Sequence, residues 1–421
     1  MFTEGNVSMA EKVKSHDNRE TRRPKAPQKK GIAKRSVKKT GISFGFPGND
    51  RMKIMAKCAV TAAAAVALLM LMIVGADLRP SAVINGFKDK YAFLHASGQG
   101  FPVEISGSRA IKVSRLKNGT ALLTDITFSV YDTQGREVVS DSHSFGSPAM
   151  ETAGVYSLLF DRMGKDYALR TISQIIAKGT AEESIICADV SESGHFVLVT
   201  TSQTTNAKVT VFSAKGQTKH KWKSVDYKIS DVAISPSGKY IALCGVSSKN
   251  GNLVSTVIVQ KVGAKENLKE FTFEDTLIFD IQYDGNNRII GIGDDMVACL
   301  DVRDDSNAGY SYDDRTLNCY DIADNGDIAL VFSKNFDGRN ASVVVLNDKC
   351  KEIASINTEM TSPYVDIDNG KINLLSQSMV SRYQYNGKLL KQAEVPADCQ
   401  EIISSQGRLL AKGVMYLTEV D

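Results

Sequence analysis

Residues 232–245, VAISPSGKYIALCG, place a short apolar strand, a polar turn centred on Gly238 and a second apolar strand in direct succession. Glycine adopts the positive φ values that tight hairpin turns require. Comparable stretches recur through the chain, 35 to 47 residues apart, around Gly119, Gly154, Gly194, Gly238, Gly285, Gly326, Gly370 and Gly407. This period predicts an all-β domain built from repeats.

A second turn recurs within several of these units, at VYDTQGREV (130–138), VFSAKGQTK (211–219) and YQYNGKLL (383–390). Two hairpins make four strands, the content of one β-propeller blade. We therefore predict an eight-bladed β-propeller. Seven blades remain the alternative because the second unit is irregular, and a β-solenoid would need much shorter repeats.

The last unit, from Cys399, has room for only three strands. A propeller closes its ring or leaves a sheet edge open. We expect residues 91–106, YAFLHASGQGFPVEIS, to supply the missing strand. No stretch after Ala76 shows a convincing helical stripe, so no helix is expected there.

Ahead of the repeats, residues 58–76 form an apolar run, CAVTAAAAVALLMLMIVGA, that contains no charged residue. At about 1.5 Å per residue, a helix of this length would span roughly 30 Å, about the thickness of the bilayer hydrocarbon. The run is apolar all round, unlike a buried globular helix. A cleavable signal peptide is the other alternative, although the whole of segment 1–57 would precede its core, which is far too long for an ordinary signal.

Charge differs sharply on the two sides of this run. Residues 1–57 carry 15 basic and 5 acidic residues, whereas residues 58–421 carry 36 basic and 43 acidic residues. The positive-inside rule places the N-terminus in the cytoplasm and the C-terminal domain outside. We expect a single-pass protein of the cell membrane with three parts: a disordered basic tail (1–50), a transmembrane helix (54–76) and an extracytoplasmic propeller (81–421).

The basic tail, which includes RRPKAPQKKGIAKRSVKK (22–39), has two interpretations. Basic runs of this kind bind nucleic acid in some proteins. Beside a membrane span, a tether held against anionic lipid headgroups is the favoured interpretation. The expected partner of this part is therefore the lipid bilayer, and no nucleic acid is expected.

The repeats resemble two kinds of known propeller. SPSGKYIA (235–242) is similar to the blade-start motif of WD-repeat-like and Tol-B-like propellers. The basic tail, single span and propeller together resemble an uncharacterised domain-of-unknown-function family of membrane-anchored propellers in Gram-positive anaerobes. The resemblance covers residues 51–421 and implies fold and placement but no activity. The chain departs from true WD repeats, because its only tryptophan, Trp222, is followed by Lys223.

The search for chemistry is largely negative. The five histidines, His16, His95, His143, His195 and His220, show no metal-binding spacing, and neither a nucleophile elbow nor a P-loop is present. The cysteines lack C-x-x-C spacing and most lie in apolar runs, which favours buried strand residues, with disulfides left open.

One region, between positions 294 and 314, is dense in carboxylates. It contains seven aspartates, namely Asp294, Asp295, Asp301, Asp304, Asp305, Asp313 and Asp314. Tyr310 and Tyr312 lie within this region, and Tyr320 lies close to it. Such loops could hold Ca²⁺, but the full EF-hand pattern is missing and solvated acidic loops are favoured. Tyrosine with aspartate also suits protein or carbohydrate recognition.

We therefore expect a non-catalytic binding or scaffold module for an envelope protein or a cell-wall glycan, with no catalytic, metal or cofactor residues assigned. The alternatives are a propeller enzyme acting on envelope glycans and a transmembrane sensor or assembly factor. For the enzyme, carboxylates paired about 5–10 Å apart on the central face would count in favour.

Overall fold

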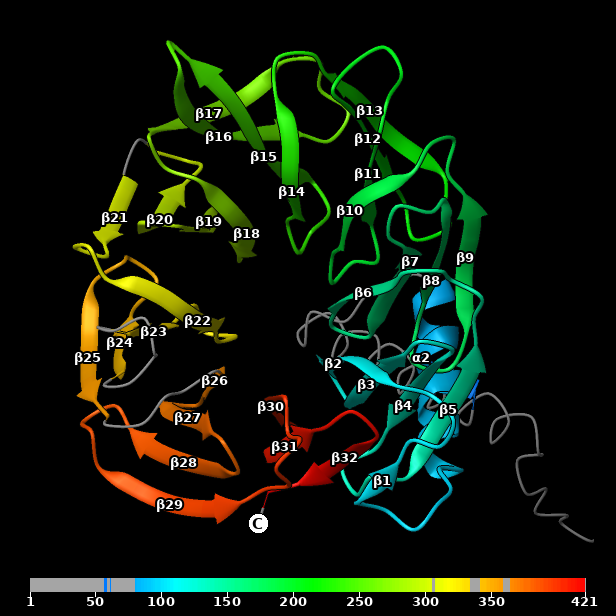
Figure 1. The fold of residues 1–421 in the computed structure, drawn as a ribbon. Helices are drawn as coiled ribbons and strands as arrows, with labels where there is room; N and C mark the ends of the chain where they lie inside the picture. The colour runs from blue at the N-terminus through cyan, green and yellow to red at the C-terminus, as the bar shows by residue number, and fades with distance from the viewer. Residues whose placement is uncertain are drawn as a thin grey trace, which may run out of the picture. The chain divides into compact units, whose positions relative to one another are not determined.

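The computed structural model describes residues 57–58, 61, 80–304, 307–333, 341–358 and 364–420. The chain divides into two compact units, residues 1–76 and 77–421. The second unit contains every strand within the described residues, and these strands form eight four-stranded antiparallel sheets arranged as the blades of a ring (Figure 1). The predicted all-β, eight-bladed propeller is confirmed.

In blades 1 to 7, the four strands follow one another along the chain, from the centre of the ring to its rim (Figure 1). Blade 1 comprises β2 (Ala110–Leu116), β3 (Gly119–Thr124), β4 (Thr127–Tyr131) and β5 (Glu137–Ser142). Blade 2 comprises β6 (Pro148–Ala153), β7 (Tyr156–Asp161), β8 (Asp166–Arg170) and β9 (Ile175–Thr180). Blade 3 comprises β10 (Ile185–Val190), β11 (Phe196–Thr200), β12 (Ala207–Phe212) and β13 (Thr218–Ser224).

The next four blades repeat this order. Blade 4 comprises β14 (Lys228–Ile234), β15 (Tyr240–Lys249), β16 (Asn252–Lys261) and β17 (Asn267–Glu274). Blade 5 comprises β18 (Ile278–Asp284), β19 (Arg288–Gly293), β20 (Met296–Asp301) and β21 (Asn307–Ser311). Blade 6 comprises β22 (Thr316–Ile322), β23 (Ile328–Ser333), β24 (Ala341–Leu346) and β25 (Glu352–Asn357). Blade 7 comprises β26 (Tyr364–Asp368), β27 (Lys371–Ser376), β28 (Met379–Gln384) and β29 (Leu389–Glu394).

Blade 8 joins the two ends of the propeller sequence. Its three inner strands are β30 (Glu401–Ser405), β31 (Arg408–Lys412) and β32 (Tyr416–Glu419), and its outer strand is β1 (Val103–Glu104). Val103 pairs with Leu417 and Glu104 with Tyr416, and the Ile105 N–H donates to the Met415 carbonyl at 2.8 Å. The expected closing strand is therefore confirmed, at the C-terminal end of the segment predicted to supply it.

Seven of the eight predicted turn glycines lie between the first and second strands of their blades, and the eighth, Gly119, is the first residue of β3. Gly238 has φ +67° and Gly326 has φ +83°, a region that side chains with a Cβ rarely adopt. The second kind of turn is also confirmed, since Gly135, Gly216 and Gly387 have positive φ between the third and fourth strands.

Each of the eight junctions between neighbouring blades has its own apolar cluster. At the junction of blades 3 and 4, Val197 and Val209 pack with Ile241 and Ile258, all with essentially no exposed surface. Fully burying such a side chain stabilises the fold by about 1.5–3 kcal/mol. The ring is therefore held together by sheet-on-sheet packing at every junction rather than by one central core.

The expectation of no helix after Ala76 is wrong. Pro80–Leu94 form the helix α2, which is packed beside β5 and the loop between β8 and β9 (Figure 1). Proline is well tolerated in a first helical turn, where its missing N–H has no partner to lose. The predicted strand segment 91–106 therefore starts with the last turn of this helix. Val83, Phe87, Tyr91 and Leu94 recur at helical spacing, but Ala92 and Phe93 on the other side obscure the stripe.

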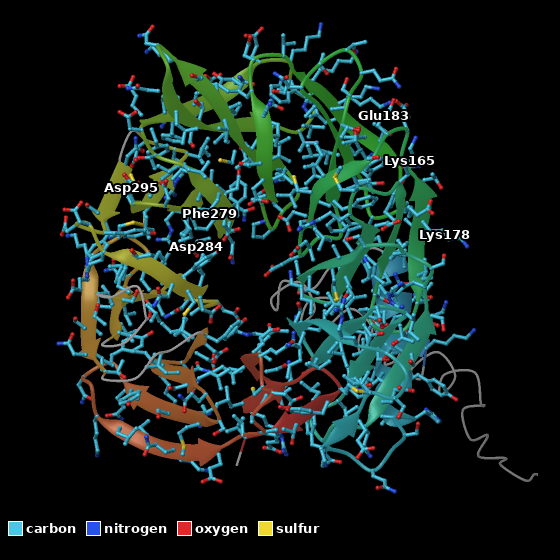
Figure 2. All side chains as sticks on the ribbon, in the orientation of Figure 1. Lys165, Lys178, Glu183, Phe279, Asp284 and Asp295 are labelled. Carbon is cyan, nitrogen blue, oxygen red and sulfur yellow. A yellow bond between two sulfur atoms is a disulfide. The ribbon has the colours of Figure 1, made fainter. Side chains whose placement is uncertain are left out.

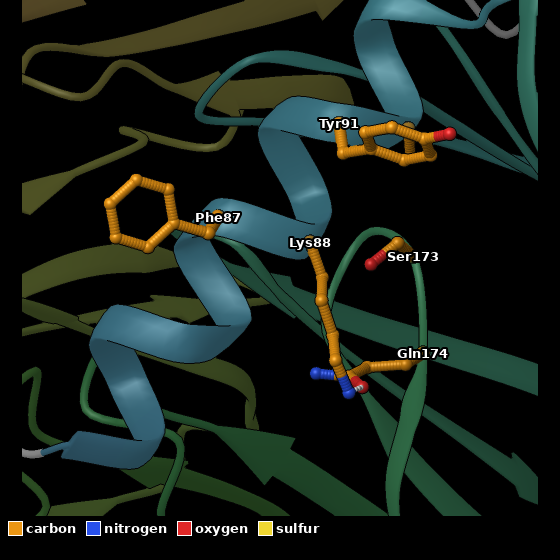
Figure 3. Close-up of a pocket in the computed structure, with 6 residues that line it drawn as sticks. Phe87, Lys88, Tyr91, Ser173 and Gln174 are labelled. Carbon is orange, nitrogen blue, oxygen red and sulfur yellow. Dashed lines mark hydrogen bonds between the residues drawn. The ribbon is translucent and has the colours of Figure 1, made fainter. Parts of the chain in front are cut away.

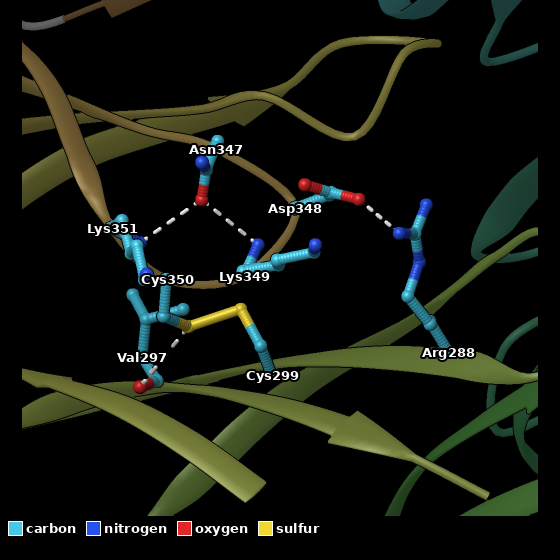
Figure 4. Close-up of a disulfide and its surroundings, with 8 residues drawn as sticks. All are labelled: Arg288, Val297, Cys299, Asn347, Asp348, Lys349, Cys350 and Lys351. Atoms are coloured by element: carbon cyan, nitrogen blue, oxygen red, sulfur yellow. Dashed lines mark hydrogen bonds and ion pairs between the residues drawn. A yellow bond between two sulfur atoms is a disulfide. The ribbon is translucent and has the colours of Figure 1, made fainter. Parts of the chain in front are cut away.

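A disulfide between Cys299 and Cys350 links blades 5 and 6, with a Cα–Cα distance of 5.9 Å (Figure 4). Cys350 has φ +54° in the turn between β24 and β25, the position that Gly135 holds between β4 and β5. The Asn347 side-chain oxygen accepts hydrogen bonds from the N–H groups of Lys349 and Lys351. In the same way, an Asp132 carboxylate oxygen accepts from the N–H groups of Gln134 and Arg136. Of the cysteines interpreted as buried strand residues, Cys187 and Cys244 are buried and unlinked.

Among the described residues, no helix combines the length and apolar character needed to cross a membrane. The predicted transmembrane helix, 54–76, lies outside the described residues except at positions 57, 58 and 61, and the predicted basic tail, 1–50, lies wholly outside them.

Candidate functional site: the charged hub

The innermost strands of five consecutive blades each carry an aspartate followed by valine or isoleucine. These are Asp189 on β10, Asp231 on β14, Asp280 on β18, Asp321 on β22 and Asp366 on β26. We call these carboxylates, together with the charged and tyrosine side chains that contact them, the hub. A carboxylate in the interior is costly unless hydrogen bonds compensate it.

Four of these aspartates accept a backbone N–H from the next blade. Asp189 accepts from Ile234 at 2.8 Å, and Asp231 from Ile281 at 2.9 Å. The two later pairs are Asp321 with Ile367 at 2.8 Å and Asp366 with Ser404 at 2.7 Å. Innermost strands have an open edge toward the hub, and a buried N–H there needs an acceptor. The aspartates supply it and join adjacent blades.

Blade 1 supplies the cations of the hub. The Arg115 guanidinium on β2 lies 3.0 Å from Asp366 and 3.4 Å from Asp321, two carboxylates on the far side of blade 8. Lys112 on the same strand lies 3.0 Å from Glu151 of blade 2. One strand therefore ties blade 1 to its neighbour, blade 2, and, past blade 8, to blades 6 and 7.

A carboxyl pair joins blades 4 and 5, and a tyrosine of blade 6 contacts it. Asp280 accepts the Tyr320 hydroxyl at 3.0 Å, and the side chains of Asp280 and Asp231 share a hydrogen bond. Burial, followed by the charge of Asp280, raises the pKa of Asp231 well above its ordinary value, and burial likewise raises the pKa of Asp280. Burial and the repulsion between two neighbouring carboxylates both favour the protonated form, so this pair binds a proton more readily than exposed aspartates do.

Two further hub aspartates have raised pKa values. Burial raises the pKa of Asp189 to about 8. Burial and then the charge of Asp366 raise the pKa of Asp321 to about 7, against the lowering effect of Arg115. The Asp321 side chain still exposes 27% of its surface, so water moderates this rise. The hub therefore carries less negative charge near neutral pH than its count of carboxylates implies.

The junction of blades 7, 8 and 1 is also polar. The Tyr364 hydroxyl donates to Glu401 at 3.0 Å, and Lys412 lies 2.9 Å from the same Glu401. Lys412 also donates to the Ile111 carbonyl at 3.1 Å. These contacts join blades 7, 8 and 1, where the two ends of the propeller sequence meet.

The acidic region singled out in the sequence is not one cluster. Asp294 accepts the Leu277 N–H at 2.9 Å, and Asp295 lies 3.3 Å from the Thr276 hydroxyl. Both precede β20, whereas Asp301 is the last residue of β20 and pairs with Arg303 at 3.1 Å. Asp313 and Asp314 lie in the next turn with positive φ, and Asp305 lies outside the described residues. Among the described residues, no group of histidine, cysteine or carboxylate side chains is arranged to hold a metal.

The three tyrosines beside this region separate into different roles. Tyr312 is buried, with its ring 5.0 Å edge-on from Phe332, so it packs the core instead of facing a ligand. Tyr310 contacts Glu352 and Arg315 in the rim of blades 5 and 6. Tyr320 alone belongs to the hub. Among the described residues, Phe279 on β18 is an aromatic side chain exposed on an innermost strand, with 39% of its surface accessible (labelled in Figure 2).

The described histidines lie at separate places in the chain. His220 is buried and contacts Gln260 at 3.2 Å across blades 3 and 4. His195 is half-buried, with Ser193 at 3.1 Å, and lies against Gly238 of the next blade. His143 contacts the Thr124 carbonyl, and burial lowers its pKa. His16 lies outside the described residues.

Sequence reasoning missed the hub, although a signal for it exists. Asp-Val occurs at 189–190 and 231–232, and Asp-Ile occurs at 280–281, 321–322 and 366–367, each time on the first strand of a repeat. A charged residue repeated inside apolar strands, at the blade period, indicates a shared position on the axis of the ring.

Comparison with solved structures agrees with this fold. A structure described as the eukaryotic initiation factor is 14% identical, with a TM-score of 0.51, and the match covers 74% of this chain and 88% of that chain. BamB from Moraxella catarrhalis is 12% identical, with a TM-score of 0.49, over 77% of this chain and 97% of that chain. At these identities the likeness concerns fold alone. No curated protein sequence matches the chain.

A family match covers nearly the whole ring. It begins at residue 101, just before the closing strand β1, and ends at residue 419, the last residue of β32. The matched residues therefore coincide with the closed propeller and leave out α2. On this match, the chain belongs to a family of unknown function, DUF5711.

Proposed function

We propose that this chain is a membrane-anchored, extracytoplasmic propeller that acts without catalysis, as a binding or scaffold module for an envelope protein or a cell-wall glycan. The observation that carries the proposal is the closure of the ring by β1 and β32. Closure yields a rigid body whose loops are free to vary, and function on such a body lies in those loops.

The hub supports a structural role for the central charges. Its aspartates bond the backbone of neighbouring blades, and Arg115 bonds two of them. The buried carboxyl pair of Asp231 and Asp280 supports the same role, because it is bonded to the Tyr320 hydroxyl of the next blade.

Two further observations support the proposed placement. The apolar run 58–76 is long enough to span a bilayer, and the charge split across it favours an outer propeller. The disulfide between Cys299 and Cys350 is of a kind that persists in oxidising compartments.

Placement can be tested with the full-length chain carrying one epitope at each end. In spheroplasts, antibody should reach the C-terminal epitope without permeabilisation and the N-terminal epitope only after it. The protein should stay in the membrane after carbonate washing. Both epitopes on one side, or release by carbonate, would overturn the anchored placement.

Binding can be tested with the full-length chain in nanodiscs, against glycan and protein fractions of the envelope kept separate. Saturable binding to one fraction is expected, and residues 1–79 alone in nanodiscs serve as the control. Equal binding by that control, or turnover of the glycan by the full chain, would contradict the non-catalytic propeller module.

A further inference from the structure

Helix α2 is attached to the propeller through its polar side. The buried Asp89 carboxylate accepts three hydrogen bonds, from the Thr171 hydroxyl at 3.0 Å, the Ser173 N–H at 2.9 Å and the Ser173 hydroxyl at 2.6 Å. Asn85, one helical turn before Asp89, accepts a hydrogen bond from the Gln174 side chain. Phe93 adds an apolar contact to the cluster between blades 1 and 2.

The opposite side of α2 is apolar and exposed. It consists of five residues with the exposed fractions Val83 38%, Ile84 54%, Phe87 71%, Tyr91 62% and Leu94 74%. At 3.6 residues per turn, these side chains fall within an arc of about 100°. Figure 3 shows Phe87 extending away from the loop that carries Ser173 and Gln174. We call this row the outer face of α2.

This arrangement inverts the usual amphipathic helix, which turns its apolar side toward the core. A contiguous apolar row left in the open marks a contact surface for another molecule or a membrane. A shallow cavity of about 390 Å³ lies at its edge, between Phe87, Tyr91 and the loop at Ser173 and Gln174 (Figure 3). We therefore expect the outer face of α2 to be covered by another molecule or by a membrane.

The chain itself indicates which occupant fits. The apolar run ends at Ala76, and α2 begins at Pro80. Four Cα-to-Cα steps of about 3.8 Å reach at most about 15 Å. If the run spans a bilayer, α2 begins within about 15 Å of the end of that span, close to the lipid headgroups.

Charge on α2 agrees with a bilayer. Lys88 and Lys90 lie on either side of the apolar arc, and both are exposed. Lysines at such borders keep their ammonium groups in the headgroup layer while their stems cover apolar surface. The Lys88 ammonium is held by Gln174 at 2.9 Å, beside the propeller surface.

We propose that α2 lies flat in the bilayer interface, with its outer face inserted among the lipid chains and its Asp89 side holding the propeller. The inference rests on the anchored placement proposed above. It adds an orientation: α2 is packed on blades 1 and 2, so that side of the ring faces the membrane. The other blades are left open to a partner.

The test uses full-length protein reconstituted in vesicles of phosphatidylcholine and phosphatidylglycerol with brominated acyl chains. W222F removes the only native tryptophan. In that background, F87W places an indole on the outer face. Its matched control is I353W, because Ile353 is also exposed, at 45%, but lies on the outer strand of blade 6. Bromolipid should quench F87W at least about twofold more than I353W, since interfacial helices bury their apolar face at acyl-chain depth.

Carbonate washing of the same vesicles separates the two proposals. Retained protein with equal quenching of F87W and I353W would overturn the interfacial helix and leave the anchor standing. Release of the protein by carbonate would overturn the anchor and the interfacial helix together. If the fluorescence of F87W depends on protein concentration and not on lipid bromination, the occupant is a second copy of the chain. That result would also overturn the inference.

Discussion

Arg115 lies 3.0 Å from Asp366, although the two residues stand on blades 1 and 7 and are 251 positions apart in the chain. The Asp366 side chain is almost fully buried, with 2% of its surface accessible, and that of Arg115 exposes 24%. Blade 8 separates these blades along the ring, so the contact bridges a junction made by the two ends of the propeller sequence. A single ion pair thus reports on whether the ring has closed.

We expect R115A to destabilise the propeller by about 2–4 kcal/mol, because removing one partner leaves a buried carboxylate without its cation. R115K keeps the charge but loses the planar fork, so it should fall between R115A and the wild type. The free energy of unfolding in urea measures this. R303A serves as the control, since the Arg303 side chain exposes 67% of its surface, and its midpoint should stay close to that of the wild type. A wild-type midpoint in R115A would refute this role.

Stability should fall as pH rises above the ordinary aspartate pKa of about 3.9. The reason is that the pKa values of Asp231 and Asp280 are raised in the folded state. The stability from such groups is complete below the unfolded pKa and is lost as pH rises through the folded one. Asp321, with a pKa of about 7, and Asp189, with a pKa of about 8, extend this loss to about pH 8.

The variant D280N tests the carboxyl pair directly. Its amide can donate to Asp231 and accept from Tyr320, which reproduces the protonated member of the pair. The decline of unfolding free energy between pH 5 and pH 8 should therefore be shallower than in the wild type. The same change at the exposed Asp314 should leave the slope as it is. An equal slope in D280N and the wild type would show that the pair does not titrate in this range.

Closure by β1 predicts a sharp boundary for truncation. A chain that begins at Phe101 retains Val103 and Glu104 opposite β32 and should unfold cooperatively as a monomer. A chain that begins at Gly107 lacks them, which leaves β32 as an open edge that recruits other chains. Light scattering after size-exclusion chromatography and urea unfolding compare the two. Identical mass and midpoint would mean that β1 contributes nothing to closure.

Two disulfide variants distinguish the stability contributed by the cross-link from the stability that depends on the residue in the turn at position 350. Replacing Cys299 and Cys350 with alanine should cost about 2–4 kcal/mol, since the cross-link closes a loop of 51 residues. C299A with C350G should lose about 1 kcal/mol less, because glycine tolerates the positive φ at position 350. Urea unfolding with and without reductant measures both. In wild-type protein taken from its membrane, alkylation without reduction should leave these two cysteines unmodified; two alkylated thiols would contradict the cross-link.

Local physics made much of the fold predictable. A glycine such as Gly238 or Gly326 permits a tight turn wherever it stands, and alternating apolar strands on both sides fix a hairpin. Counting these hairpins predicted the blades, and the short last unit predicted a closing strand. The segment chosen for that strand began within a helix that was not recognised, because Ala92 and Phe93 obscure its apolar stripe, and Phe93 packs on the propeller.

The hub was less accessible to sequence reasoning. Asp231 and Asp280 are 49 positions apart, and nothing local shows that their side chains meet. The density of carboxylates from Asp294 to Asp314 drew attention instead, yet Asp294 and Asp301 lie at opposite ends of β20.

The sequence alone determined the repeat, the hairpins and the apolar run, because each depends on residues close together along the chain. Tertiary structure alone decided that Arg115 meets Asp366, that Cys299 meets Cys350 and that the apolar side of α2 points outward. These relationships arise from ring closure and sheet packing, which bring distant residues within a few ångströms. Only the folded ring decides which side of a helix it covers, and here Asp89 is bound to the loop at Thr171 and Ser173.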